Sequence, residues 1–427
     1  MKIWLVTIGE PIFHPLNKLR LHRTGILAKF IAENTDNEVV WWTSTFSHFT
    51  KEHIYDSDTY VEVLPDLKMI AMRGKGYKRN ISIDRIIDHA QIADKFKRLI
   101  KTEEKPDIIV VAFPTMGLCR VALEYGKIYD VPVIIDYRDM WPEVYVDILP
   151  PKLQNIGRLF LRTLFVQVSS LFSEAYGIIG ITQDFLNLAL QKAKRERKEA
   201  DGVFPLGYLL NQYNELDMND AERFWASILN FNSKRLRICF FGAIGYQSNW
   251  DTITNAALLL KERNINVEFV ICGSGDKLEE MKIAAKGNDH IVFPGFVSAA
   301  QIRALMDISD IGLCAYFPKE SYMNSVPGKA IEYMSAGLPI LSTLKGGTLG
   351  HLIDDNKIGF HYVHDSVESL IAILNQIIQN KEDLKKMRGN INVIYNENFD
   401  ADHVYRQYVA HLEKVVKAFS VSKKSNG

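Results

Sequence analysis

Short apolar runs alternate with longer amphipathic segments along almost the whole chain. The short runs are rich in Val, Ile and Leu, which is typical of strands buried on both faces of a parallel sheet. The longer segments repeat their apolar residues at helical spacing. Strands that alternate with helices predict right-handed βαβ units, so we expect an α/β fold with doubly wound parallel sheets.

The pattern occurs twice in succession, which predicts two Rossmann-like domains facing a central cleft. In the first half we expect strands at 3–8, 38–43, 108–112, 133–136 and 177–181, and helices at 21–33, 82–101 and 116–129. In the second half we expect strands at 237–241, 267–272, 291–293, 311–315, 339–342 and 360–363, and helices at 250–262, 277–286, 301–306 and 328–336.

A highly charged stretch at 191–202 and a Pro-Leu-Gly turn after it indicate a domain boundary near residue 208. We therefore predict an amino-terminal domain at 1–208, a carboxyl-terminal domain at 209–395 and a final amphipathic helix at 396–420. That helix is indicated by Val404, Tyr405, Tyr408, Val409, Leu412 and Val415.

The composition is that of an ordinary globular protein: of 427 residues, 47% are hydrophobic and 24% are charged. Basic and acidic residues number 51 each, so no nucleic-acid partner is predicted. The four Cys are scattered without metal-ligand spacing, which favours small core residues in a reducing compartment. The chain begins directly with a strand-like run and shows no signal peptide, so we expect a cytoplasmic protein.

One apolar segment, 159–172, raises the question of whether it contacts or spans a membrane. Arg162, Gln167 and two Ser interrupt it, and it is shorter than the roughly 20 apolar residues that span a bilayer. We expect a buried core helix, with an interfacial helix as the alternative.

The segment Ser325–Pro339 carries the most specific chemistry. Asn324 or Ser325 is expected to cap its helix, with Pro327 in the first turn. Lys329 then lies at the positive end of the helix dipole, where a cation is unfavourable unless an anion binds beside it. This predicts a phosphate site, with Glu332 one turn later placed to accept hydrogen bonds from ribose hydroxyls. The alternative is a capped surface helix with a Lys–Glu pair.

Three further turns follow predicted strands of the second half. Glycine at such turns allows the backbone to approach a diphosphate, and an exposed aromatic edge can hold a flat base. No GxGxxG or GxxxxGKS motif is present, so neither a nicotinamide enzyme nor a P-loop ATPase is indicated. The candidate residues are Gly242 and Gly245, Gly273 and Gly275, and Phe296 and Val297.

Polar residues also follow two predicted strands of the first half, at positions that belong to the carboxyl edge of the sheet. The alternative for Arg138 and Asp139 is an ion pair that holds a loop. Metal binding is not predicted, since the eleven His lack HxxxH spacing and Asp56-Ser-Asp58 lies in a polar loop. The candidate residues are Gly9, Glu10, Arg20, His22, Arg23, Arg138 and Asp139.

Together these motifs resemble a retaining glycosyltransferase of family 4 with the GT-B fold, in the bacterial branch that builds surface polysaccharides. The likeness is strongest in 325–341, then in 136–142, then in 9–48. It implies that the amino-terminal domain binds the acceptor, that the carboxyl-terminal domain binds the nucleotide sugar, and that the final helix packs back on the amino-terminal domain.

The resemblance also implies individual roles. Glu332 would bind the donor ribose, Ser325, Gly328 and Lys329 would hold the diphosphate, and the loops at Gly242 and Gly273 would flank the nucleotide. We expect Pro327, Gly245, Gly275, Phe296 and Val297 to complete the donor site, and Lys329, Arg138 and Asp139 to act in catalysis. The acceptor would contact Gly9, Glu10, Arg20, His22 and Arg23.

The chain departs from the family pattern at two places. Asn324 stands where the first of two Glu residues is usual, which leaves the donor sugar open. Ala243 and Ser248 replace an Arg and a Lys that usually meet the leaving diphosphate, and Arg138, Arg20 or Arg23 could substitute for them.

The implied reaction moves a hexose or modified aminohexose from a nucleotide diphosphate, expected to be UDP, to a sugar hydroxyl. The acceptor would be a glycan or lipid-linked sugar for lipopolysaccharide or capsule, and no metal or other cofactor is expected. Peripheral contact with the inner face of the plasma membrane is a further expectation. The alternatives are a nucleotide-sugar epimerase of the same fold and a catalytically silent nucleotide-sugar-binding partner. The sequence does not indicate the sugar, the linkage, the need for a catalytic base or the oligomeric state.

Overall fold

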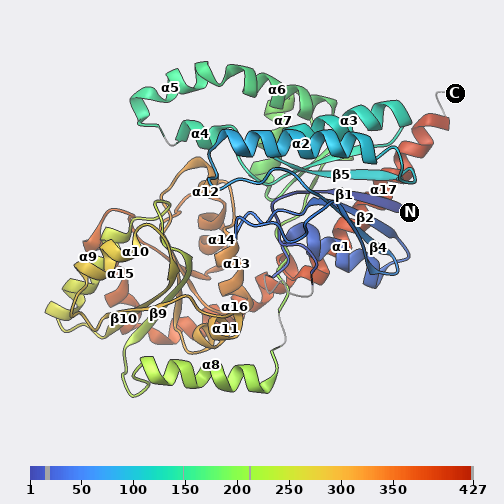
Figure 1. Ribbon diagram of the computed structural model, residues 1–427. Helices are drawn as coiled ribbons and strands as arrows, with labels where there is room; N and C mark the ends of the chain where they lie inside the picture. The colour runs from blue at the N-terminus through green and yellow to red at the C-terminus, as the bar shows by residue number, and fades with distance from the viewer. Residues whose placement is uncertain (15–19, 148, 211–212, 425–427) are drawn as a thin grey trace. The chain divides into compact units, whose positions relative to one another are not determined.

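The computed structural model describes residues 1–14, 20–147, 149–210 and 213–424 (Figure 1). The chain divides into two compact units. The amino-terminal unit contains Met1–Gly207 together with the chain from Ala401 onward, and the carboxyl-terminal unit contains Tyr208–Asp400. The chain returns to the amino-terminal unit at Ala401, later than the predicted residue 396. The reason is that the helix Lys381–Asn398 runs unbroken and belongs to the carboxyl-terminal unit.

The amino-terminal unit is built on an eight-stranded sheet with the order β3-β4-β2-β1-β5-β6-β7-β8. Every pair is parallel except β3 with β4, an antiparallel edge pair that the sequence pattern did not predict. The strands are β1 (Lys2–Val6), β2 (Glu38–Ser44), β3 (Thr59–Leu64), β4 (Leu67–Met72), β5 (Ile108–Phe113), β6 (Val133–Tyr137), β7 (Gly177–Gly180) and β8 (Gly202–Val203). The helices are α1 (Arg23–Asn34), α2 (Ile83–Leu99), α3 (Met116–Tyr129), α4 (Glu143–Asp147), α5 (Pro151–Phe160), α6 (Arg162–Glu174), α7 (Gln183–Ala193) and α17 (Ala401–Lys424).

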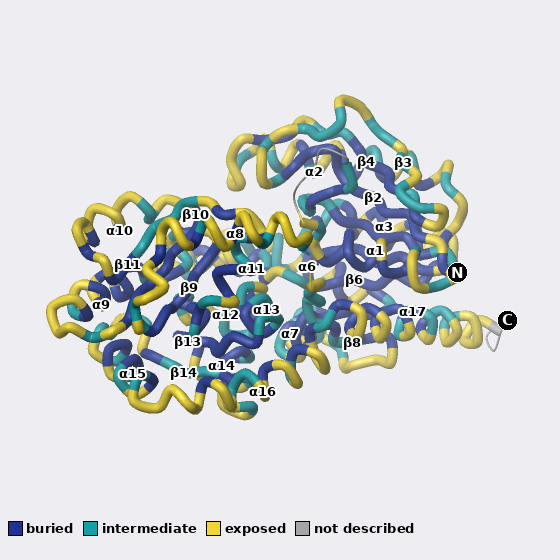
Figure 2. The backbone as a smooth tube through the Cα atoms, turned by 90° about the horizontal axis from the view of Figure 1, so that it is seen from below, coloured by how far each residue is buried: buried dark blue, intermediate teal, exposed yellow. Residues whose placement is uncertain are grey.

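Helices cover both faces of this sheet, as a continuously apolar strand requires. Along β1, Trp4 and Val6 belong to a core formed with α2, α3, α6 and α7. Ile3 and Leu5 point the other way, into a core formed with α1 and α17. Figure 1 shows α2 and α3 on the opposite side of the strands from α1 and α17, and Figure 2 shows the strands between them as buried.

Helix α17 is an integral part of the amino-terminal unit, although about 200 residues separate it from β8. Its apolar stripe, which includes Tyr405, Tyr408 and Leu412, is buried in the second core. The ring of Tyr408 stacks on Phe204 with centroids 4.6 Å apart. Gly207 allows the chain to pass close to the helix, since a Cβ there would lie 2.9 Å from the Tyr405 ring.

The carboxyl-terminal unit contains a six-stranded parallel sheet with the order β11-β10-β9-β12-β13-β14. The strand order reverses between β9 and β12, so this sheet has a topological switch point there. The strands are β9 (Leu236–Ala243), β10 (Val267–Ser274), β11 (Ile291–Gly295), β12 (Ile311–Cys314), β13 (Ile340–Ser342) and β14 (Gly359–His361). The helices are α8 (Glu215–Ile228), α9 (Trp250–Glu262), α10 (Leu278–Ala284), α11 (Ala299–Asp307), α12 (Glu320–Met323), α13 (Gly328–Ser335), α14 (Thr348–Asn356), α15 (Val367–Gln379) and α16 (Lys381–Asn398).

The apolar segment 159–172 is not a single buried helix, and that expectation was wrong for its first part. It spans the end of α5 and most of α6, and only Val168, Leu171 and Phe172 are buried. Leu159 and Phe160 lie on the surface. No helix in the described part of the chain is long and apolar enough to cross a membrane.

Candidate functional site

Two glycine loops meet beside the switch point of the carboxyl-terminal unit. The register of β9 and β10 places Gly242 beside Gly273, at the carboxyl ends of both strands. The following loops are joined by backbone hydrogen bonds from Ile244 N to the Ser274 carbonyl (2.9 Å) and from Lys277 N to the Ile244 carbonyl (3.0 Å). Ligands of open α/β sheets bind outside the carboxyl ends of strands at such a point.

The close approach of these loops requires glycine. Gly273 has φ +126°, and a Cβ there would lie 1.9 Å from the Gly242 carbonyl oxygen. Gly275 has φ +153°, and its Cβ would lie 2.4 Å from the Ile244 carbonyl oxygen. Both positions combine a backbone conformation that other residues rarely adopt with a backbone neighbour that cannot move aside.

We expect Gly273→Ala to lower the free energy of unfolding by more than the matched change Gly287→Ala. Gly287 also has positive φ (+74°), but nothing lies within 4 Å of its Cβ position. Its substitution carries only the conformational strain, about 1–2 kcal/mol, whereas Gly273→Ala adds overpacking of about 1–3 kcal/mol. Urea unfolding of both variants measures the difference, and equal losses would contradict the close packing of the loops.

Helix α13 is fixed to both strands that flank the switch point. The Tyr333 hydroxyl donates to carbonyl oxygens of Cys239 on β9 and Leu313 on β12, each at 3.2 Å. Its ring covers Gly312, where a Cβ would lie 2.3 Å from the ring. Lys329 is one turn earlier on the same face of the helix, so this anchor sets where its side chain reaches.

The Lys329 ammonium lies over the end of β9. It is 4.5 Å from the ring centroid of Phe240 and 5.6 Å from that of Phe241. A Cβ on Gly242 would be 2.7 Å from Nζ, so the amine lies directly against the first glycine loop. The bare glycine backbone and the cation therefore occupy the same edge of the sheet.

Lys329 is a half-buried cation without a carboxylate in contact. Across the described residues, we find no ion pair or hydrogen bond that involves its side chain. Burial lowers the pKa of Lys329 below its ordinary value, and the more distant Glu332 only partly offsets this. An anion bound beside Nζ would restore the charged form and recover the lost solvation.

The start of α13 differs from the expected capped helix. Pro327, with ψ 138°, is the residue before the first helical turn rather than part of it. Pro327 occupies the cap position and makes no side-chain capping hydrogen bond, and Ser325 donates its hydroxyl to the Tyr322 carbonyl (3.4 Å). The first backbone N–H groups of α13 receive no hydrogen bond from the side chain at the cap position, and they lie next to Lys329, where an anion can bind.

The other predicted donor residues lie at the same edge with different exposures. Gly245 accepts a hydrogen bond from Trp250 Nε1 (2.9 Å), and Glu332 is half-buried on α13. Phe296 is 87% exposed after β11, whereas Val297 is only 6% exposed. Val297 packs inward. Contrary to the expectation, its side chain is therefore not available to contact a base.

In the amino-terminal unit, three predicted site residues form a buried ionic cluster around Asp136. Arg23 donates to both carboxylate oxygens (2.9 and 3.2 Å), and Arg138 Nε donates to Oδ2 (2.9 Å). Arg138 also pairs with Glu10, whose carboxylate accepts from the backbone and hydroxyl of Thr24. The two guanidinium groups are thus committed to carboxylates, contrary to the expectation that they meet a ligand.

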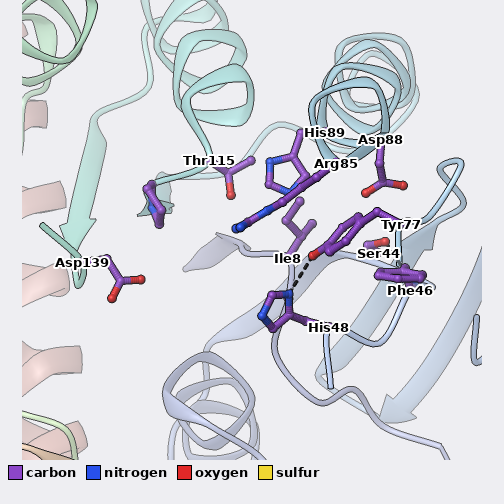
Figure 3. A pocket seen from close by; sticks show the side chains of 12 residues that line it. Ile8, Ser44, Phe46, His48, Tyr77, Arg85, Asp88, His89, Thr115 and Asp139 are labelled. Atoms are coloured by element: carbon purple, nitrogen blue, oxygen red, sulfur yellow. Dashed lines mark hydrogen bonds between the residues drawn. The ribbon is translucent and has the colours of Figure 1, made fainter. Parts of the chain in front are cut away.

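A cavity of about 170 Å³ opens beside this cluster and collects other polar groups (Figure 3). His48 Nδ1 and the Tyr77 hydroxyl share a hydrogen bond of 2.7 Å. Burial lowers the pKa of His48 to about 4 and that of His89 to about 4, so both rings are neutral near pH 7. The lining residues are Ile8, Gly9, Ser44, Phe46, His48, Tyr77, Arg85, Asp88, His89, Pro114, Thr115 and Asp139.

Only two of the sequence candidates from this unit, Gly9 and Asp139, line the cavity. Burial raises the pKa of Asp139 above its ordinary value. Arg20 is exposed, and His22 precedes α1 with its ring against Phe49, 5.3 Å between centroids. His89, Arg85 and Tyr77 could not be predicted as site residues from the sequence, because no motif separates them from an ordinary helix face and loop.

The described part of the chain contains no group of three or more His, Cys, Asp or Glu side chains arranged to hold a metal ion. All four cysteines are buried thiols without disulfide partners.

Comparisons with known proteins agree with this architecture. Residues 222–392 match the family model "Glycosyl transferases group 1". A segment of 113 residues, 26% of this chain, is 27% identical to the 2-deoxystreptamine N-acetyl-D-glucosaminyltransferase of Niallia circulans and covers 28% of that protein. The chain spans 28–39% of the length of the curated relatives it matches.

Two solved structures share the fold over nearly the whole chain. Sucrose-phosphate synthase from Thermosynechococcus elongatus is similar with a TM-score of 0.70 and 14% identity, covering 98% of this chain and 99% of that one. Anabaena Alr3699/HepE, solved in complex with UDP, is similar with a TM-score of 0.64 and 15% identity, covering 97% and 99%. Residues 222–392 are thus similar to the glycosyltransferase group 1 family, and the chain has a two-unit α/β fold of the GT-B type that it shares with these structures.

Proposed function

We propose that the chain is a retaining, metal-independent glycosyltransferase of family 4, and that its carboxyl-terminal unit binds the diphosphate of a nucleotide sugar. The observation that carries the proposal is Lys329, a half-buried cation without a carboxylate in contact, held against Gly242 at the switch point of the sheet. A diphosphate supplies the negative charge that this position lacks, and the glycine loops allow its oxygens to reach backbone N–H groups.

The nucleotide of the proposed donor is uridine diphosphate. The similar Anabaena structure contains UDP, which supports this choice. Glu332 follows Lys329 by one turn and is assigned to the ribose, and the exposed ring of Phe296 is assigned to the base. The donated group is a hexose or modified aminohexose, and the proposed acceptor is a sugar hydroxyl of a surface glycan or its lipid-linked precursor.

In the proposed reaction, the bond from the anomeric carbon to the diphosphate oxygen breaks and a bond to the acceptor oxygen forms on the same face. The acceptor proton moves to the departing phosphate oxygen. Lys329 and the amino end of α13 stabilise the charge that develops on the diphosphate. This needs no separate base on the protein.

The acceptor is assigned to the cavity of the amino-terminal unit. Its neutral imidazoles and the Tyr77 hydroxyl can exchange hydrogen bonds with sugar hydroxyls, and Asp139 can accept one. The buried cluster around Asp136 positions this wall, because Arg138 links the loop of Asp139 to the loop of Gly9 and Glu10.

A nucleotide screen and a product assay test the proposed function. We expect UDP to raise the unfolding midpoint more than other nucleoside diphosphates do, and mass spectrometry to detect a glycosylated acceptor. Conversion of the nucleotide sugar without an acceptor, followed by NMR, would instead indicate an epimerase. Binding without turnover across an acceptor panel would indicate a silent partner, which the replacements Ala243, Ser248 and Asn324 would then explain.

We expect His48→Ala to raise the KM for the acceptor by about tenfold while the KM for the donor stays unchanged. The expected size is that of one lost hydrogen bond to a ligand, about 1–1.5 kcal/mol. His403→Ala, on the exposed side of α17, serves as the matched control. A rise in the donor KM, or no change in either constant, would contradict the assignment of this cavity to the acceptor.

A further inference from the structure

We propose that α5 and the start of α6 form a docking surface for a membrane that contains anionic lipid. The surface is defined by the apolar residues Leu153, Ile156, Leu159, Phe160 and Val166 and the basic residues Lys152, Arg158 and Arg162. The proposed docking surface does not depend on the proposed glycosyl transfer, so either proposal can be wrong without the other.

The apolar part of this surface is concentrated on one short helix. Leu153, Ile156 and Phe160 recur at helical spacing and form one stripe, with Leu159 beside it. Phe160 is 82% exposed and Leu159 is 68% exposed, although residues of these types are usually buried. Figure 1 shows α5 at the outer edge of its own unit, away from the sheet.

One position of α5 is in close contact with the preceding loop. Gly157 is buried, and a Cβ there would lie 2.4 Å from a methyl group of Leu149. The small residue lets the helix lie close to that loop, so the exposed apolar side chains belong to a helix that is packed against its own unit.

The charges around the stripe indicate what covers it. Between Pro150 and Ser173 the chain has three basic residues and no acidic residue. Lys152, Arg158 and Arg162 are exposed, and none of them forms an ion pair within the described residues. An apolar stripe flanked by unpaired cations matches the interface of a bilayer with negative headgroups.

A second copy of the chain fits this surface less well. A two-fold contact would bring the same three cations of each copy together, and no carboxylate of α5 or of the start of α6 could offset them. Helix α5, with 10 residues, is also too short to span a bilayer. The surface therefore suits a helix that lies in the plane of the headgroups.

Sedimentation of the full chain with lipid vesicles tests the proposal. We expect binding to vesicles of phosphatidylcholine mixed with phosphatidylglycerol, and much weaker binding to phosphatidylcholine alone. The double variant Leu159→Ser/Phe160→Ser should bind the mixed vesicles at least about tenfold more weakly. Each of Lys152→Gln, Arg158→Gln and Arg162→Gln should weaken binding by roughly fivefold.

The matched control is Ile128→Ser/Ile283→Ser, which removes two apolar side chains of similar exposure, 71% and 76%, on α3 and α10. It should bind like the unaltered chain, and both double variants should keep its unfolding midpoint. Equal sedimentation of all variants would overturn the proposal. Self-association in solution that is lost in Leu159→Ser/Phe160→Ser would also overturn it and would assign the surface to a second copy.

Discussion

Lys329→Ala is expected to slow glycosyl transfer by about 2–4 kcal/mol of barrier, which is roughly 30- to 1,000-fold in kcat. The reason is electrostatic: Nζ lies against Gly242 at the carboxyl edge of the sheet, where charge develops on the departing diphosphate. Steady-state transfer from a UDP-sugar, followed by mass spectrometry of the product, measures the loss.

The unfolding midpoint of a Lys329 variant distinguishes a catalytic role of this residue from a structural role. Lys329 has no ion pair to lose, and burial already lowers its pKa, so Lys329→Met should not lower the unfolding midpoint. Lys277→Ala is the matched control: this lysine lies in the neighbouring loop, 5.1 Å from the Tyr246 ring, and pairs with Glu280. Unchanged turnover in Lys329→Ala, or equal loss in Lys277→Ala, would refute the assigned role.

Asp136→Leu is expected to destabilise the amino-terminal unit by about 3–5 kcal/mol, because it leaves Arg23 and Arg138 buried without their shared carboxylate. Asp130→Asn is the control, since Asp130 and Lys423 form an exposed pair whose loss should change stability little. Denaturant unfolding compares the two. Similar losses would show that the cluster around Asp136 contributes no more than a surface pair.

The same cluster should make stability depend on acid. Burial alone would raise the pKa of Asp136, but Arg138 and Arg23 outweigh it and hold this pKa below its ordinary value. A carboxyl with a lowered pKa contributes stability above the pKa of the unfolded chain, about 3.9. That contribution is lost as the pH falls through the folded pKa. Asp136→Leu should therefore flatten the acid limb of the stability profile.

The alternation of apolar runs and amphipathic segments was sufficient to predict the α/β fold. The helices at 116–129 and 250–262 were placed with their observed bounds, since each has an uninterrupted apolar period. The edge pair β3–β4 was missed although β4 is an apolar run that is buried except at Lys68; only β3 is half-exposed. Leu159 and Phe160 were expected inside because burial is the usual fate of such residues, and sequence alone does not show which face a unit leaves uncovered.

Some residues of the candidate site could likewise be predicted from the sequence, and others could not. Lys329 and the glycine loops could be found from sequence, because an unfavourable cation and glycines after strands are local signals. Arg138 is only 2 positions from Asp136 in the chain, but Arg23 is 113 positions away. No local pattern predicts that both arginines share this carboxylate. The cavity with His48, Tyr77 and His89 likewise depends on how a loop and a helix meet, which only the folded chain shows.

If Lys329 and the glycine loops bind a diphosphate, calorimetric titration should separate UDP from uridine. The unaltered chain should bind UDP far more tightly than uridine. Lys329→Ala should lose most of that preference while its affinity for uridine stays the same. Equal affinities of the unaltered chain for UDP and uridine, or a preference for UDP that survives in Lys329→Ala, would show that Lys329 does not bind a diphosphate.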